Sequence, residues 1–180
     1  MTSRPTTQRI LSGLLVLLPC AVLVGRLLTA EPSEPFYNND ETRHVMTGVF
    51  FADALRSLPL HDPKQFAIAY YLQYPALGIP LYPPLFYMIE GAGMTVLGPS
   101  VLVGKGLVLL FLLAACIFLY RIVRGTHGVT EARIAVLVFG LSPQVALLSG
   151  QVMLDVPMVA LALGALFFFC RYLRTSAVGT

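Results

Sequence analysis

Charged side chains are scarce in this sequence. Only 12% of its 180 residues are Asp, Glu, Lys or Arg, about half of the roughly 25% typical of soluble domains, whereas 57% are hydrophobic. So little charge excludes an ordinary soluble domain and makes a bilayer the expected solvent. The length leaves room for roughly three to five helical spans and one modest extramembrane segment.

The sequence lacks the residue patterns that are typical of several other functions. The net charge of +3 is small and scattered, and no basic stripe with interleaved aromatics indicates nucleic-acid binding. Cys20, Cys116 and Cys170 each lie alone in an apolar run, which predicts small buried hydrophobes and not disulfides or metal ligands. The sequence also has no phosphate-cradling glycine loop, no metal-spaced His/Cys cluster and no Ser/His/Asp arrangement.

What is present is a set of apolar runs that predicts an all-α membrane protein. The predicted spans cover approximately residues 10–29, 101–123, 134–149 and 156–172. About twenty apolar residues cross the hydrocarbon as a helix, and Ser142-Pro143 predicts a bend in the third span. A cleaved signal peptide is the alternative for the first run, but its long apolar core favours an uncleaved anchor.

The two sides of this topology differ in charge. The predicted cytoplasmic segments hold seven arginines against Glu131 alone, a net charge of +6, and the predicted outer segments have a net charge of −3. This asymmetry agrees with the positive-inside rule, by which cytoplasmic segments carry an excess of Lys and Arg. We therefore predict an integral, multi-pass protein of the plasma (inner) membrane with a cytoplasmic N-terminus. The arginines in question are Arg4, Arg9, Arg121, Arg124, Arg133, Arg171 and Arg174.

The predicted outer loop, residues 30–100, holds seven of the nine carboxylates. Asn38 and Glu41 form a capping-box variant that predicts a helix over about 40–58, with Phe51, Leu55 and Leu58 on its apolar face. Shorter helices are expected over about 64–73 and 84–97. The loop thus predicts amphipathic helices that lie along the membrane surface.

Two aspartates are the candidate catalytic residues. Asp40 begins the first surface helix, and Asp155 lies in the short turn between the third and fourth predicted spans. Both therefore map to the outer face, where they could converge on one site. Each also has a structural interpretation, because Asp40 could complement the N-terminus of its helix and Asp155 could cap the fourth span.

The neighbouring residues also have two interpretations. Glu41 suits helix capping, whereas Arg43 and His44 are spaced to pair with Asp40 on one helix face. His44 fits a surface hydrogen-bonding group better than a general base. Lys105, one turn into the second span, could snorkel or meet a lipid phosphate. The aromatic tract is typical of an interfacial belt or of a platform for sugar or lipid; it comprises Tyr70, Tyr71, Tyr74, Tyr82, Phe86 and Tyr87.

With these residues placed, the chain resembles the membrane glycosyltransferases of the family-39 and protein O-mannosyltransferase type, which include the bacterial aminoarabinose transferases. Asp40-Glu41 resembles the acidic pair after the first span of that group. The run from Tyr82 to Tyr87 resembles its Pro-Pro-Leu-Tyr-Tyr tract, and Leu154-Asp155-Val156-Pro157 resembles its second acidic motif. The order and the spacing of the three motifs agree with the group over nearly the whole chain.

The resemblance implies inverting transfer of a sugar from a polyprenyl-phosphate donor to a lipid, glycan or protein acceptor at the outer face. Asp40 would be the general base and Asp155 would help shape or polarise the site. Candidate substrate-binding residues are Glu41, Arg43, Tyr82, Pro83, Pro84, Tyr87 and Lys105. No metal ligand is predicted and no cofactor is required besides the lipid-linked sugar, although a divalent ion bridging carboxylates and phosphate would fit the chemistry.

Members of this group are several hundred residues long, so a chain that ends at Thr180 is expected to be a fragment or reduced relative with a single membrane domain, residues 1–180. The alternative function is a non-catalytic membrane scaffold or assembly subunit that kept the fold. A transporter is disfavoured because Asp40 and Asp155 map to the outer boundary and not to a midplane site.

Overall fold

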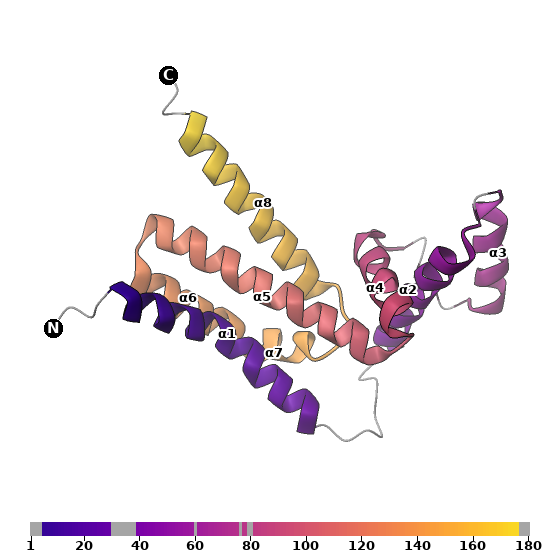
Figure 1. Cartoon of the computed structure of the whole chain (residues 1–180), viewed down its shortest axis with the longest axis horizontal. Coiled ribbons are helices and arrows are strands. Elements are labelled where there is room, and N and C mark those ends of the chain that lie inside the picture. The colour runs from indigo at the N-terminus through magenta and orange to yellow at the C-terminus, as the bar shows by residue number, and fades with distance from the viewer. Residues whose placement is uncertain (1–4, 30–38, 60, 76, 79–80, 177–180) are drawn as a thin grey trace. The chain divides into compact units, whose positions relative to one another are not determined.

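The computed structural model describes residues 5–29, 39–59, 61–75, 77–78 and 81–176, and its regular elements in these ranges are all α-helices (Figure 1). In chain order they are α1 (Pro5–Thr29), α2 (Asn39–Ser57), α3 (Pro63–Gln73), α4 (Leu85–Leu97), α5 (Val101–Thr126), α6 (Val129–Gly140), α7 (Pro143–Ser149) and α8 (Asp155–Ser176).

Three helices of the described chain are long and apolar enough to cross a membrane, at Thr6–Gly25, Val101–Thr126 and Asp155–Thr175. The pair α6 and α7 would make a fourth span, bent by 60° at the break between the two helices. Ser142 causes part of this break, because its hydroxyl accepts a hydrogen bond from the Val145 amide and caps α7. The predicted fold class, an all-α membrane protein with about four spans, is confirmed.

The described chain forms two compact units, which are considered separately. The first contains α1, α6, α7, α8 and the part of α5 from Val108 onward. The second contains α2, α3, α4, the start of α5 as far as Leu107, and the segment Gln151–Leu154.

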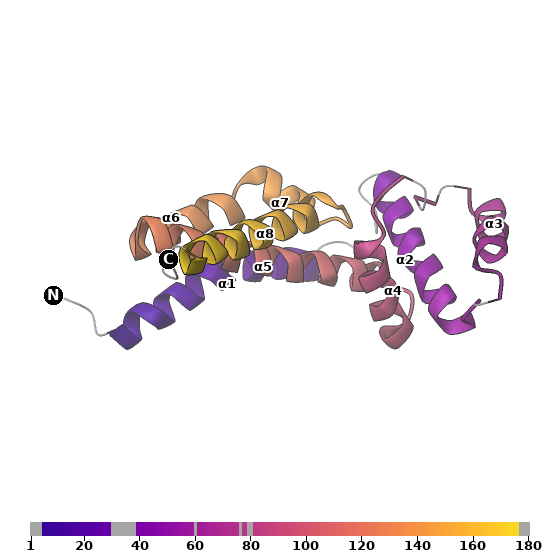
Figure 2. The ribbon, with the colours of Figure 1, turned by 90° about the horizontal axis from the view of Figure 1, so that it is seen from above.

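In the first unit α1 packs along α6, and the two helices lie side by side in Figures 1 and 2. A polar contact joins them near one end. The Arg133 guanidinium donates hydrogen bonds to the Ser12 hydroxyl at 3.1 Å and to the Gln8 carbonyl at 2.7 Å. Leu110, Val138 and Phe168 stay exposed, as apolar side chains do when lipid is the solvent.

In the second unit α2 packs closely against α4 (Figure 2). A methyl group added at Gly91 of α4 would lie 2.6 Å from Phe51 Cβ, so this close approach requires a glycine. The face of α2 that packs includes Val45 and Ala52, whereas Leu55 and Leu58 are exposed. Of the three large apolar residues singled out in the sequence, Phe51 therefore lies at the contact with α4, whereas Leu55 and Leu58 do not pack there.

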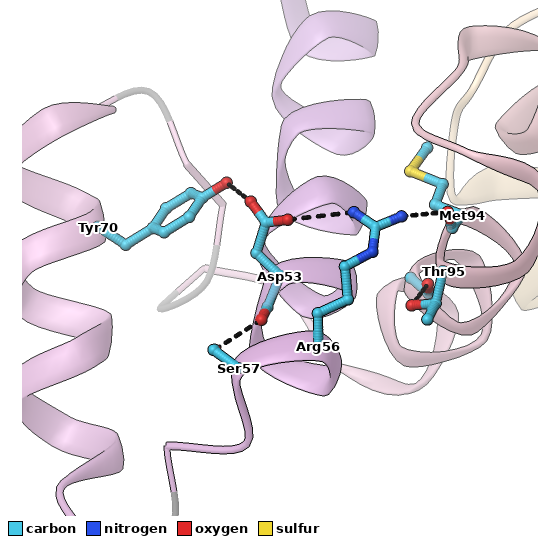
Figure 3. Close-up of polar contacts among 7 residues, drawn as sticks. Asp53, Arg56, Ser57, Tyr70, Met94 and Thr95 are labelled. Atoms are coloured by element: carbon cyan, nitrogen blue, oxygen red, sulfur yellow. Dashed lines mark hydrogen bonds and ion pairs between the residues drawn. The ribbon is translucent and has the colours of Figure 1, made fainter.

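The helix α3 is attached to α2 by aromatic and polar contacts. Phe50 of α2 meets the rings of Phe66 and Tyr70, with ring centroids 5.6 Å and 5.1 Å away. The Tyr70 hydroxyl donates a 2.9 Å hydrogen bond to Asp53 (Figure 3). Burial and the Asp53 carboxylate together raise the pKa of Tyr70 above its usual range.

Asp53 also connects this contact to α4. Its second oxygen lies 3.3 Å from Arg56 Nη1, and Arg56 Nη2 donates a 2.9 Å hydrogen bond to the Met94 carbonyl (Figure 3). One aspartate on α2 therefore helps to hold α3 on one side and, through Arg56, α4 on the other.

Candidate active site

Asp40 lies in the first turn of α2, where it meets Arg43. The Asp40 carboxylate is 3.3 Å from Arg43 Nη1, and 52% of its side-chain surface is exposed. The predicted pairing of Asp40 with Arg43 is confirmed. An exposed ion pair of this kind adds little to stability, about 0.2–1 kcal/mol. The exposed half of the Asp40 side chain leaves its carboxylate accessible.

Glu41, the next residue, faces the interior of the second unit. Its side chain is fully buried, and Oε1 lies 3.6 Å from Lys105 Nζ. The same oxygen accepts a 3.0 Å hydrogen bond from the Val152 amide. Glu41 thus connects α2 with the first turns of α5 and with the segment Gln151–Leu154. The capping role suggested by sequence did not anticipate these contacts, because they depend on residues far away in the chain.

Lys105 is mostly buried, with 15% of its side chain exposed. The sequence allowed it either to snorkel or to meet a lipid phosphate, and the structure gives its ammonium group the Glu41 carboxylate as a partner. A contact between Lys105 and the donor phosphate stays a prediction. The pair with Glu41 holds the Lys105 stem in place, so an incoming phosphate would find the ammonium group already positioned.

His44 is also buried, with 3% of its surface exposed, which corrects its interpretation as a surface hydrogen-bonding group. Its Nδ1 lies 2.7 Å from the Tyr87 hydroxyl, and its ring centroid lies 5.1 Å from that of Tyr82. The reason is the close packing of α2 on α4, which covers the face of α2 that bears His44. Burial raises the pKa of Tyr87 above its usual range.

The loop before α4 is held against α2 by Thr47. The Thr47 hydroxyl donates to the Arg43 carbonyl at 2.8 Å and accepts a 3.0 Å hydrogen bond from the Gly78 amide. A side chain at Gly78 would meet both Tyr82 at 3.1 Å and Arg43 at 3.4 Å. This contact therefore brings Arg43 and Tyr82 to the same part of the second unit.

The tract Tyr82-Pro83-Pro84 leads into α4. Pro84 is the N-cap of that helix, and both prolines are exposed while Tyr82 is partly buried. Phe86 and Tyr87 are 5% and 1% exposed, so these two aromatics belong to the core and not to an interfacial belt. The structure brings Tyr82 and Tyr87 together around His44.

One buried carboxyl was missed in the sequence. Glu90 of α4 is fully buried, and neither of its oxygens has a hydrogen-bond partner among the described residues. Its side chain lies against Gly48 of α2 and Gly104 of α5, where any added methyl group would collide with the carboxyl. Burial raises the pKa of Glu90 to about 9. A glutamate inside the apolar run Leu85–Leu97 was the signal that could have found it.

Asp155 is exposed and begins α8, so it belongs to the first unit, whereas Asp40 belongs to the second. The convergence of the two aspartates on one site stays a prediction. Pro157, two residues later, is buried in the first turn of α8, where a proline is well tolerated. Among the residues that the structure describes, no three His, Cys, Asp or Glu side chains gather in a way that could hold a metal ion.

Comparison with known proteins identifies one family. The model of the dolichyl-phosphate-mannose-protein mannosyltransferase family matches residues 82–179, which is more than half of the chain. The match begins at Tyr82 and includes Lys105 and Asp155; Asp40 and Glu41 precede it. No curated protein and no solved structure matches the chain significantly.

Proposed function

The chain belongs to the dolichyl-phosphate-mannose-protein mannosyltransferase family, and from this membership we propose that it moves a sugar from a polyprenyl-phosphate donor to an acceptor hydroxyl at the outer face of the membrane. The observation that carries the proposal is the arrangement at the start of α2. An exposed Asp40 is held by Arg43 at 3.3 Å, next to a buried Glu41 that is anchored on Lys105.

In the proposed reaction Asp40 is the general base. Its carboxylate takes the proton of the acceptor hydroxyl while the hydroxyl oxygen attacks the anomeric carbon of the sugar. The bond from that carbon to the phosphate oxygen breaks, and the polyprenyl phosphate leaves with the electron pair. Attack from the face opposite the phosphate inverts the anomeric configuration.

The residues around Asp40 support this role. Arg43 Nη1, at 3.3 Å from the Asp40 carboxylate, orients the base. Arg43 also packs near Gly78 and Tyr82, so the base and the Tyr82-Pro83-Pro84 tract belong to one local structure. We assign Tyr82 and the prolines to substrate binding, where an aromatic ring next to a rigid backbone offers a sugar a flat apolar surface.

Lys105 and Asp155 are assigned roles that assist the transfer. Lys105 provides a positive charge for the donor phosphate, although a lysine lacks the bidentate geometry of an arginine. Asp155 shapes or polarises the same site from the start of α8. Both assignments require that these residues and Asp40 meet the substrates together.

The test is transfer of radiolabelled mannose from dolichyl phosphate mannose to membrane proteins in vesicles that contain the chain. Asp40→Asn keeps the shape of the side chain but cannot accept the proton, so transfer should fall about 100-fold to 10,000-fold. Asp62→Asn is the matched control, because asparagine still caps α3 where Asp62 now accepts from the Gln65 amide.

Full transfer by the Asp40→Asn variant would overturn the assignment of the base. Absence of transfer by the unaltered, folded chain would favour the alternative function, a membrane scaffold that keeps the family's fold. Extraction behaviour and thermal unfolding of each variant separate loss of chemistry from loss of fold.

A further inference from the structure

A second polar site lies in the first unit, at the C-terminal ends of α5 and α8. A cleft of about 130 Å³ opens there between the two helices. Three arginines line it, Arg121 from α5 and Arg171 and Arg174 from α8. At roughly 30 Å³ per water molecule, this volume accommodates a group the size of a phosphate.

The positive charge of this cleft is not neutralised within the described chain. No carboxylate among the described residues forms a salt bridge with Arg121, Arg171 or Arg174. Three guanidinium groups around one small cleft repel one another, so an anion that enters between them gains attraction from each and relieves that repulsion.

The protein positions two of these guanidinium groups. Arg121 lies over the ring of Phe167, with Cζ 5.9 Å from the ring centroid, and Arg174 Nη2 donates a 3.1 Å hydrogen bond to the Gly125 carbonyl. A guanidinium group has five N–H donors. Arg174 therefore keeps most of its donors for a ligand while one bond fixes its place, which lowers the entropy cost of binding.

The lining of the cleft is mixed in character. The Thr126 hydroxyl adds a polar group beside the arginines, whereas Phe167 and Cys170 give an apolar wall. Both helices that form the cleft are candidate membrane spans, and the cleft lies at their ends. Headgroups of phospholipids occur at that level of a membrane, with the acyl chains next to the apolar helix surfaces.

From these contacts we infer that the cleft of Arg121, Arg171 and Arg174 binds the phosphate group of an anionic membrane phospholipid. Arginine forms paired hydrogen bonds with phosphate oxygens, and three arginines select a headgroup with net negative charge over a zwitterionic one. The bound lipid would join the ends of α5 and α8. This site is separate in sequence from the residues proposed for sugar transfer, and its test does not depend on that activity.

The experiment is native mass spectrometry of the full chain after titration with phosphatidylglycerol or with phosphatidylcholine. Phosphatidylglycerol should bind preferentially. A juxtamembrane arginine contributes about fivefold to affinity for anionic lipid, so Arg121→Gln with Arg171→Gln should weaken binding about 25-fold. The matched control is Arg124→Gln, which removes the same charge from the same end of α5 but lines a different cleft.

Two results of the titration, a phosphate arm and a stability control test the assignment of this cleft. Equal binding of the two phospholipids, or unchanged phosphatidylglycerol binding by the double variant, would overturn it. Inorganic phosphate is added in a separate arm, and displacement of the lipid by stoichiometric phosphate would assign the cleft to the free ion and also overturn it. Cooperative thermal unfolding of the double variant without added lipid excludes loss of fold as the cause.

Discussion

Glu41 Oε1 lies 3.6 Å from Lys105 Nζ, and this buried ion pair joins the start of α2 to the first turns of α5. Glu41 directly follows Asp40, the candidate base, and Lys105 directly follows Gly104, against which the Glu90 side chain lies. The pair therefore holds the exposed candidate base in register with the part of α5 that touches Glu90.

Breaking this ion pair from one side should be strongly destabilising. In Lys105→Met the Glu41 carboxylate stays buried without its partner, and we expect a loss of about 3 kcal/mol. Adding Glu41→Gln removes the stranded charge while its amide oxygen can still accept from Val152, so the double variant should regain part of that stability. Thermal unfolding in detergent measures both changes. Simple addition of the two single effects would contradict the proposed coupling.

Replacement of Glu90 should change how stability depends on pH. The folded chain holds the Glu90 proton up to about pH 9, whereas an ordinary glutamate has a pKa of 4.5. Deprotonation therefore favours unfolding, and stability falls as pH rises between these values, by up to about 1.4 kcal/mol per pH unit. Glu90→Gln keeps the shape of the side chain but replaces the titrating carboxyl group with an amide that does not titrate.

The comparison of melting temperatures at pH 5 and pH 8 tests this expectation. The two proteins should unfold at nearly the same temperature at pH 5, and Glu90→Gln should be the more stable one at pH 8. Parallel pH curves would show that Glu90 is already ionised in the folded state. Using the difference between the two proteins removes the contribution of every other titrating group.

The His44–Tyr87 contact should contribute modestly to stability. Tyr87→Phe removes the hydroxyl that lies 2.7 Å from His44 Nδ1, and the buried imidazole loses a partner. A cost of about 1–3 kcal/mol follows for a buried polar group of this kind. Tyr82→Phe is the control, because it keeps the ring that meets His44 at 5.1 Å. An equal effect of both variants would indicate that the hydrogen bond is unimportant.

Replacement of Arg43 should lower the transfer activity more than it lowers the stability of the fold. Its ion pair with Asp40 is largely exposed, so Arg43→Gln should change the free energy of unfolding by less than about 1 kcal/mol. The same variant removes the charge that orients the proposed base, so mannose transfer should fall by more than its stability does. Arg56→Gln is the control, since Arg56 forms a similar i,i+3 pair with Asp53; thermal unfolding measures separately the loss of its contact with the Met94 carbonyl. Equal transfer rates in the two variants would argue against a role for Arg43.

The membrane orientation can be tested by labelling. Gln65 on α3 and Thr130 at the start of α6 are both exposed, and the charge distribution predicts that they lie on opposite sides of the membrane. A membrane-impermeant maleimide added to intact cells should label Gln65→Cys and not Thr130→Cys, relative to the unaltered chain with its own three cysteines. Labelling of Thr130→Cys alone would reverse the predicted topology.

Much of the fold follows from local sequence. Apolar runs long enough to span a bilayer, few charges and prolines at the breaks predicted an all-α membrane protein, since each of these acts within a few residues. The Asp40–Arg43 pair was also predictable, because residues three apart share a helix face. The resemblance that led to the family rested on motifs that can be read in order along the chain.

The interior of the second unit depended on packing. The sequence analysis interpreted Glu41 as a capping residue and His44 as a surface residue and did not single out Glu90, yet all three are buried. Their environment is set by contacts with Lys105, Tyr87, and the glycines Gly48 and Gly104. Such contacts join residues that lie far apart in the chain, so no local pattern reveals them.

The sequence by itself therefore determined the class of protein, its spans and the position of an exposed aspartate at the head of a helix, because hydrophobicity, chain length and helical spacing are local properties. Only the tertiary structure decided which carboxylates are buried. It also brought Arg121 and Arg171 to one cleft, since the burial and pairing of a charge depend on which helices pack together.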